Sequence, residues 1–144
     1  MTATHYLRPP WAARVIGGRM ARLFKPRVVS LLSVPGRTTD TWRSTPVAVL
    51  GHEGHEYLMA AYGDTEWSRN LRASGSGRLT RGGATEEFTA EEVPAGELPG
   101  LVQEYLRQFG TMPNVTRTFE ALPDPADHPA FRITVTGRGP RRRP

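Results

Sequence analysis

Short candidate strands bounded by turn signals, some apolar and some alternating between apolar and polar residues, fill much of this chain after residue 27, and they constrain its fold more than any other feature. The runs that share this pattern are residues 28–34, 45–50, 55–61, 78–81, 86–92 and 131–136. The four-residue loop Gly51-His-Glu-Gly54 and the pair Gly82-Gly83 each separate two neighbouring runs at hairpin spacing. Strands this short and this closely spaced predict a sheet that closes, or half closes, into a barrel.

Other segments have helical spacing. A helix from Pro99 carries apolar residues three and four positions apart. They are Leu98, Leu101, Val102, Tyr105, Leu106 and Phe109. Asp64 is the expected N-cap of a shorter helix that runs through Trp67 and stops near Ser74-Gly75, and residues 115–122 have room for one or two helical turns. The chain is therefore predicted to be mainly β with α (α+β), a barrel with peripheral helices.

A length of 144 residues with 38% hydrophobic content fits one compact domain. We assign it to residues 28–136, between an N-terminal segment, 1–27, and a basic tail, 137–144. The absence of cysteine excludes disulfides, a thiolate nucleophile and cysteine metal sites. The four histidines form no metal-ligand pattern, so no metal is expected. No run approaches the ~20 apolar residues of a membrane span, and no signal peptide is evident, so the expected location is the cytoplasm.

The N-terminal segment has apolar residues at helical spacing over positions 11–24. Its other face carries Arg14, Arg19 and Arg22. Such a basic amphipathic helix either packs on the domain, which we favour, or makes a peripheral contact with an anionic membrane surface.

The net charge is +5, and Lys25 is the only lysine. Arginine presents a planar fork that suits phosphate and carboxylate groups, although a genome rich in G and C also replaces lysine by arginine. The basic run Arg141–Arg143 would attract nucleic acid without reading its sequence, and no base-reading module accompanies it. Nucleic-acid binding is therefore disfavoured, and only clustered arginines count toward an anionic ligand.

One loop gathers such a cluster. Between Pro35 and Pro46, Arg37 and Arg43 lie six residues apart across a turn, and Gly36 exposes backbone N–H. Two arginines arranged in this way can converge on one phosphate. A solvated hairpin loop would look the same, so this loop alone does not decide between the two interpretations.

A second motif, Trp67-Ser-Arg-Asn70-Leu71-Arg72, follows after one hairpin. Together the two motifs resemble the deazaflavin-dependent nitroreductases of the split β-barrel (FMN-binding, PNPOx-like) superfamily. Members of that family carry Gly-Arg-Lys-Ser-Gly-x-x-Arg-x-x-Pro and a later Trp-x-x-Asn-Leu. The resemblance covers roughly residues 28–93, with Thr38 and Asp40 in place of the family's lysine and second glycine.

The resemblance implies an oxidoreductase that transfers a hydride from reduced coenzyme F-420 (8-hydroxy-5-deazaflavin), in preference to FMN, to an electron-poor apolar acceptor such as a quinone, enone or nitro compound. The loop would hold the phosphate and acidic tail, and the segment around Trp67 would lie along the deazaflavin. The positions implied in cofactor binding are Gly36, Arg37, Thr38, Thr39, Arg43, Thr45, Pro46, Trp67, Asn70, Leu71 and Arg72.

Tyr62 is the candidate catalytic residue, because a tyrosine near the cofactor could donate a proton, although a tyrosine at a strand end is more often a packing residue. Proline at position 46 would keep a neighbouring strand from pairing there, since it has no N–H to donate. The charge change at Thr38 and Asp40 motivates an alternative: a split-barrel relative without tight cofactor binding that acts as a binding module or a cofactor-independent cyclase. Family members are monomers or homodimers, and both states remain open here.

Overall fold

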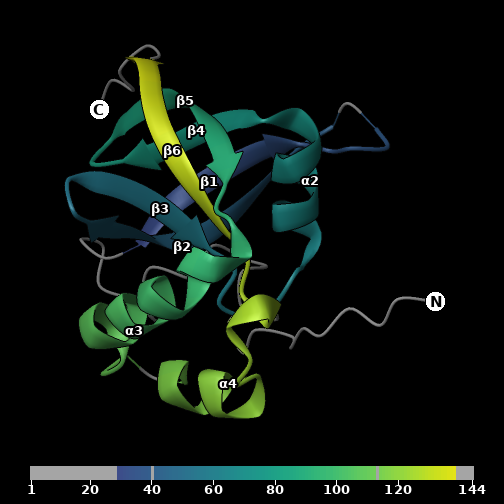
Figure 1. The fold of residues 1–144 in the computed structure, drawn as a ribbon. Helices are drawn as coiled ribbons and strands as arrows, with labels where there is room; N and C mark the ends of the chain where they lie inside the picture. The colour runs from purple at the N-terminus through teal and green to yellow at the C-terminus, as the bar shows by residue number, and fades with distance from the viewer. Residues whose placement is uncertain (1–28, 40, 113, 139–144) are drawn as a thin grey trace.

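The computed structural model describes residues 29–39, 41–112 and 114–138. Within these ranges, antiparallel strands form a closed barrel in the order β1-β2-β3-β6-β5-β4 (Figure 1). The strands are β1 (Val29–Pro35), β2 (Trp42–His52), β3 (His55–Met59), β4 (Ser76–Arg81), β5 (Ala84–Glu92) and β6 (Ala130–Arg138). The predicted barrel is confirmed, and each predicted run contributes one strand to it.

The alternation of side chains along β1 shows how the barrel closes. Leu32 and Val34 are 0% and 2% exposed and face the interior, whereas Leu31 between them is 38% exposed. β1 pairs on one side with β2 and on the other with β4. Burial of every second residue is the pattern of a strand with one face on a core. The interior cluster is Leu32, Val34, Leu58, Leu71, Leu79, Phe88, Phe131 and Ile133.

A tight turn joins the two strands of each hairpin. Between β2 and β3 only Glu53 and Gly54 lie outside the strands, and their φ values are 52° and 80°. Gly82 and Gly83 join β4 to β5 with φ values of 60° and 79°. Two successive positive φ angles match the right-handed twist of the flanking strands. The first turn is thus shorter than the predicted four-residue loop, because β2 and β3 continue to the pair His52 and His55.

In the described part of the chain, three helices pack outside the barrel, as predicted: α2 (Glu66–Ser74), α3 (Leu98–Phe109) and α4 (Val115–Ala121). Figure 1 shows α2 against the side of the barrel and α3 with α4 below it. Short 3-10 turns, η2 (Ala95–Glu97) and η3 (Pro125–Asp127), precede α3 and β6. A second apolar cluster joins α3 and α4 to the outer faces of β2 and β3. Its members include Leu50, Tyr57, Met59, Leu101, Tyr105, Phe109 and Phe119.

The N-cap of α2 corrects one expectation. The cap residue is Thr65 and not Asp64, and no side chain caps the helix. Asp64 lies one residue earlier, where its carboxylate accepts a hydrogen bond from Ser68 Oγ at 2.6 Å. The end of the helix agrees with the prediction, because Gly75 adopts a left-handed conformation with φ 70° and its N–H donates to Leu71 O.

The predicted N-terminal helix, with its membrane contact, lies outside the described residues, and so does nearly all of the basic tail. Among the residues that the structure describes, no helix is long and apolar enough to cross a membrane.

Candidate functional site

The loop between β1 and β2 is closed by its own backbone. Gly36 N–H donates to Thr41 O at 2.9 Å. A Cβ atom at position 36 would lie 2.8 Å from Thr39 O, closer than real Cβ contacts allow. Glycine is therefore needed here for the close approach of the loop to itself, and Thr38 and Thr39 remain exposed at its surface.

Asn70 of α2 anchors this loop. Its side chain is 4% exposed, and its Oδ1 accepts hydrogen bonds from Arg37 N at 3.1 Å and from Arg37 Nη1 at 2.7 Å. A buried amide oxygen that accepts from a guanidinium makes a stronger bond than a neutral pair does. The sequence prediction that the two motifs face each other is thus met by a direct contact between Arg37 and Asn70.

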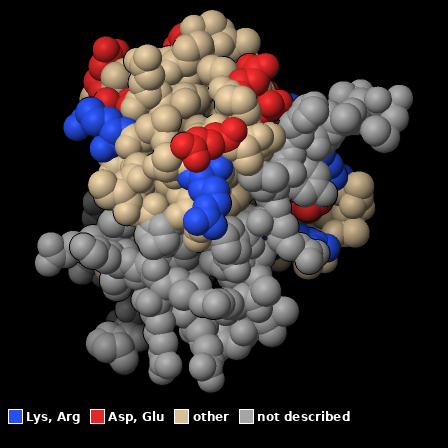
Figure 2. All heavy atoms as spheres, turned by 90° about the horizontal axis from the view of Figure 1, so that it is seen from below, with Lys and Arg blue, Asp and Glu red and all other residues tan. Residues whose placement is uncertain are grey.

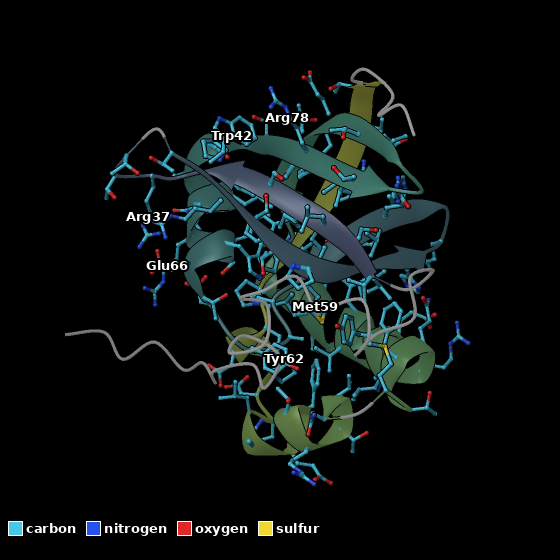
Figure 3. All side chains as sticks on the ribbon, turned by 180° about the vertical axis from the view of Figure 1, so that it is seen from behind. Arg37, Trp42, Met59, Tyr62, Glu66 and Arg78 are labelled. Atoms are coloured by element: carbon cyan, nitrogen blue, oxygen red, sulfur yellow. The ribbon has the colours of Figure 1, made fainter. Side chains whose placement is uncertain are left out.

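Glu66, one turn earlier on α2, completes the contact. Arg37 Nη1 donates to Glu66 Oε1 at 2.9 Å, and Nη2 lies 3.5 Å from Oε2. This hydrogen bond from Arg37 lowers the pKa of Glu66, with burial opposing and the charges of Arg37, Arg69 and Arg43 contributing. The carboxylate therefore stays ionised at neutral pH, in the middle of a group of arginines. Figure 3 shows Arg37 and Glu66 together beside α2.

Arg43 occupies the first part of β2 and is exposed. Its charge contributes to the lowered pKa of Glu66, which places it on the same side of the molecule. Within the described ranges it makes no ion pair within 4.0 Å. Arg43 thus differs from Arg37, whose guanidinium is already engaged by two side chains.

An apolar cavity of about 70 Å³ lies next to this loop and helix. It is lined by Val29, Pro46, Val47, Ala48, Met59, Ala61, Tyr62, Trp67, Tyr105, Met112, Val115 and Thr118. Trp67 follows Glu66 directly, so α2 contributes to both the arginine loop and the cavity. The Trp67 ring also packs on Phe131 with centroids 6.2 Å apart. In Figure 3, Met59 and Tyr62 lie between the barrel and the lower helices.

Pro46, which lines the cavity, lies in a part of β2 that has a partner strand on one side only, as far as the structure describes the chain. Pro46 pairs with Leu31 of β1. On its other side, β2 pairs with β3 only from Val49 to His52. The stretch of β2 before Val49 therefore has a partner strand on one side only among the described residues, as proline in a strand requires.

Two tyrosines reach the cavity. Tyr62 lies in the turn after β3, where the sequence placed it near the site. Tyr105 of α3 is 5% exposed, and burial raises its pKa, with a smaller contribution from the charge of Tyr62. Its hydroxyl therefore stays protonated at physiological pH. The Tyr105 side chain lines the cavity, where its hydroxyl can donate to a ligand.

His128 holds the Tyr62 segment in place. The imidazole is fully buried and stacks on Phe119 with centroids 4.2 Å apart. Nδ1 lies 3.1 Å from Ala60 O, and Nε2 lies 2.7 Å from Leu122 O. This ring links the end of α4 to the turn that carries Tyr62, which gives His128 a structural role.

Three of the predicted cofactor residues make contacts within the protein. Leu71 is 0% exposed within the barrel core. Arg72 donates from Nε to Glu92 Oε1 at 2.7 Å and also pairs with Asp64, so its guanidinium is engaged by two carboxylates. Thr45 is half-buried and pairs with Leu32 of β1.

The sequence interpretation did not include Glu66 as a site residue, nor the cavity lining from α4 and the loop before it. Glu66 precedes Trp67 in the sequence, and its place in the first helical turn was the only signal. Met112, Val115 and Thr118 come from segments that resemble ordinary amphipathic helix and loop. Their approach to the cavity depends on how α4 folds back under the barrel.

Charges on the lower face of the molecule are mixed. In the view of Figure 2, blue and red spheres of the described residues lie beside one another, and they form no broad surface of one sign. This distribution does not resemble the continuous basic stripe of a nucleic-acid-binding face.

A closed antiparallel barrel of six strands with peripheral helices is a split-barrel α+β fold. The family model described as F420H(2)-dependent quinone reductase matches residues 8–116. The chain therefore belongs to this family of oxidoreductases. The resemblance stated from the sequence is confirmed, and the family's name implies dependence on the reduced deazaflavin coenzyme.

Solved structures share the fold at low identity. An F420-H2 Dependent Reductase (FDR-A) is 17% identical, with a TM-score of 0.56 over 75% of this chain and 95% of that one. A protein described as a domain-swapped dimer is 15% identical, with a TM-score of 0.57 over 86% and 97%. Atu2129 from Agrobacterium tumefaciens str. C58, of unknown function, is 16% identical, with a TM-score of 0.62 over 95% and 60%. No curated protein matches the chain.

Proposed function

We propose that this protein binds the reduced deazaflavin coenzyme F-420 and uses it to reduce an apolar, electron-poor acceptor, with quinones as the first class to test. The observation that carries the proposal is the sharing of α2 between two sites. Glu66 and Asn70 hold the arginine loop, and Trp67 lines the cavity. A ligand with an anionic end and a flat aromatic end would match this pair of sites.

The residues present fit such a coenzyme. Donors for phosphate and carboxylate groups would come from Arg43 and from the exposed Thr38 and Thr39. Arg37 would add its guanidinium once it is released from Glu66. Trp67 and Pro46 supply apolar walls for a ring, and β2 has an unpaired edge beside them. When bound, the coenzyme would supply the hydride, and the protein would supply position and charge.

We assign Tyr105 as the cavity residue that forms a hydrogen bond to the acceptor. Its protonated hydroxyl can donate to a carbonyl oxygen of a quinone, which becomes more negative as the acceptor is reduced. Tyr62 lines the same cavity and is the candidate proton donor for that oxygen. Met59, Met112 and Val115 would contact the apolar remainder of the acceptor.

The test is a turnover assay with reduced coenzyme F-420 and a panel of quinones, enones and nitro compounds, followed by the absorbance of the deazaflavin. We expect oxidation of the coenzyme that depends on both the protein and a quinone. Tyr105→Phe should retain coenzyme binding and slow turnover. Tight coenzyme binding with no turnover on any acceptor class would contradict the assignment of a reductase.

A second candidate is a binding module or a cofactor-independent cyclase built on the same cavity. The observation in its favour is that the Arg37 guanidinium already forms an ion pair with Glu66, while Thr38 carries no charge. This candidate predicts that an apolar ligand fills the cavity without the coenzyme. It would be favoured if neither oxidised nor reduced deazaflavin bound to the protein. A homodimer, the state named for one structural neighbour, is compatible with either candidate.

A further inference from the structure

We propose that Glu66 is a specificity-determining residue that acts as a built-in competitor: its carboxylate stands where an anionic group of the ligand would bind Arg37, and the ligand must displace it. This inference deepens the proposed function and rests on it. It concerns a residue of this chain that neither predicted motif includes.

The geometry of the contact is that of ligand recognition. Arg37 faces both carboxylate oxygens of Glu66, with Nη1 at 2.9 Å from Oε1 and Nη2 at 3.5 Å from Oε2. Planar two-point contacts of this kind are the usual way in which arginine binds carboxylate and phosphate oxygens. The carboxylate of Glu66 therefore marks the place for a phosphate or carboxylate of the ligand.

Glu66 can leave without disturbing Arg37. The Glu66 side chain is 70% exposed, and exposed ion pairs contribute little to stability. Arg37 is held independently, because Asn70 Oδ1 accepts from both its backbone nitrogen and Nη1, and Asn70 is 4% exposed. After Glu66 swings away, the guanidinium remains aimed at the vacated position.

The charge of Glu66 determines which ligands would bind more tightly after its removal. Arg69 Nη1 lies 4.0 Å from Glu66 Oε2, and Arg43 is close enough to influence the carboxylate. An ionised Glu66 cancels one positive charge within this group of arginines. Its removal should raise the affinity of anionic ligands and leave uncharged ligands unaffected, and added salt should weaken the effect.

The experiment compares the wild type with Glu66→Gln and with Glu97→Gln, a matched loss of one exposed carboxylate at the start of α3. Two probes are titrated: the deazaflavin coenzyme and the same ring with a ribityl chain but no phosphate. We expect Glu66→Gln to bind the coenzyme about fivefold tighter at low salt, with a smaller gain at high salt. The phosphate-free probe and the Glu97→Gln variant should show no change.

Equal or weaker coenzyme binding by Glu66→Gln would overturn the inference and leave the proposed function intact. A parallel titration with pyrophosphate, followed by the NMR signals of arginine side-chain N–H groups, separates the two claims. If no variant binds the coenzyme, the proposed function fails. The role of Glu66 is then decided by pyrophosphate alone, which should bind tighter to Glu66→Gln, and unchanged pyrophosphate binding would refute it.

Discussion

Asn70 and Arg37, 33 positions apart in the sequence, are joined by two hydrogen bonds to one buried oxygen. Asn70 Oδ1 accepts from the backbone nitrogen of Arg37 and from its guanidinium, and this contact fixes the loop against α2. The asparagine therefore acts as a positioning residue for the loop.

Replacing this asparagine should weaken both the fold and the site. Asn70→Ala removes the two part-buried hydrogen bonds that its Oδ1 accepts from Arg37, and at about 0.5–1.5 kcal/mol each these contribute about 1–3 kcal/mol together. We expect a loss of that size in the free energy of urea unfolding, together with weaker coenzyme binding. Gln103→Ala, on the exposed face of α3, is the control for side-chain truncation. Unchanged stability and affinity in Asn70→Ala would show that the contact does not hold the loop.

The loop geometry can be tested at Gly36 with little effect on the barrel. In Gly36→Ala the new Cβ would meet Thr39 O at 2.8 Å, so the loop must shift. Coenzyme affinity should fall several-fold, and the unfolding midpoint in urea should change little because the loop lies outside the core. Gly51→Ala is the matched control, since a Cβ there meets nothing within 4 Å. Equal coenzyme affinity in Gly36→Ala and Gly51→Ala would show that the loop takes no part in ligand binding.

Much of the barrel follows from the sequence because most strands carry a local signal: a short apolar or alternating run next to a glycine or proline. Asp64 shows where local signals fail. It has the right type and place for an N-cap, yet Ser68 and Arg72 engage its carboxylate, and Thr65 takes the cap position.

The candidate site was predictable in part for the same reason. Arg37, Trp67 and Asn70 belong to motifs with fixed spacing, whereas Arg72 is held by Glu92, a residue 20 positions away that no local pattern identifies. Contacts between residues so far apart in the sequence depend on the register of the strands.

Tyr105 gives a test of the acceptor side of the cavity. Tyr105→Phe keeps the ring and its edge contact with Phe109, 4.8 Å between centroids, and removes only the hydroxyl. Turnover on a quinone should fall two- to tenfold, roughly what the loss of one hydrogen bond allows. Coenzyme affinity should not change. Tyr57→Phe, a buried tyrosine outside the cavity lining, is the control. Equal turnover by both variants would remove Tyr105 from the site.

Stability in acid should depend on Glu56, which joins β3 to β4. Arg81 Nη1 donates to Glu56 Oε2 at 2.8 Å, and this hydrogen bond lowers the pKa of Glu56 below its ordinary value of 4.5. A lowered pKa contributes stability that is present above pH 4.5 and is lost as the pH falls through the lowered value. Because Glu56 is 40% exposed, the contribution should be no more than about 1 kcal/mol.

The measurement is urea unfolding of the wild type and Glu56→Gln from pH 7 to pH 3. The wild type should be the more stable protein at pH 7, and the difference should shrink below pH 4.5. A difference that stays constant over this range would show that the charge of Glu56 has no part in it.

The central claim is that one ligand spans the arginine loop and the Trp67 cavity, and a fluorescence titration tests it most directly. In a protein with Trp11 and Trp42 replaced by phenylalanine, Trp67 is the sole tryptophan. Titration with reduced coenzyme F-420 should quench Trp67 with a micromolar Kd, and Arg43→Ala in the same background should weaken binding at least tenfold. Absence of quenching, or quenching unaffected by Arg43→Ala, would contradict the claim.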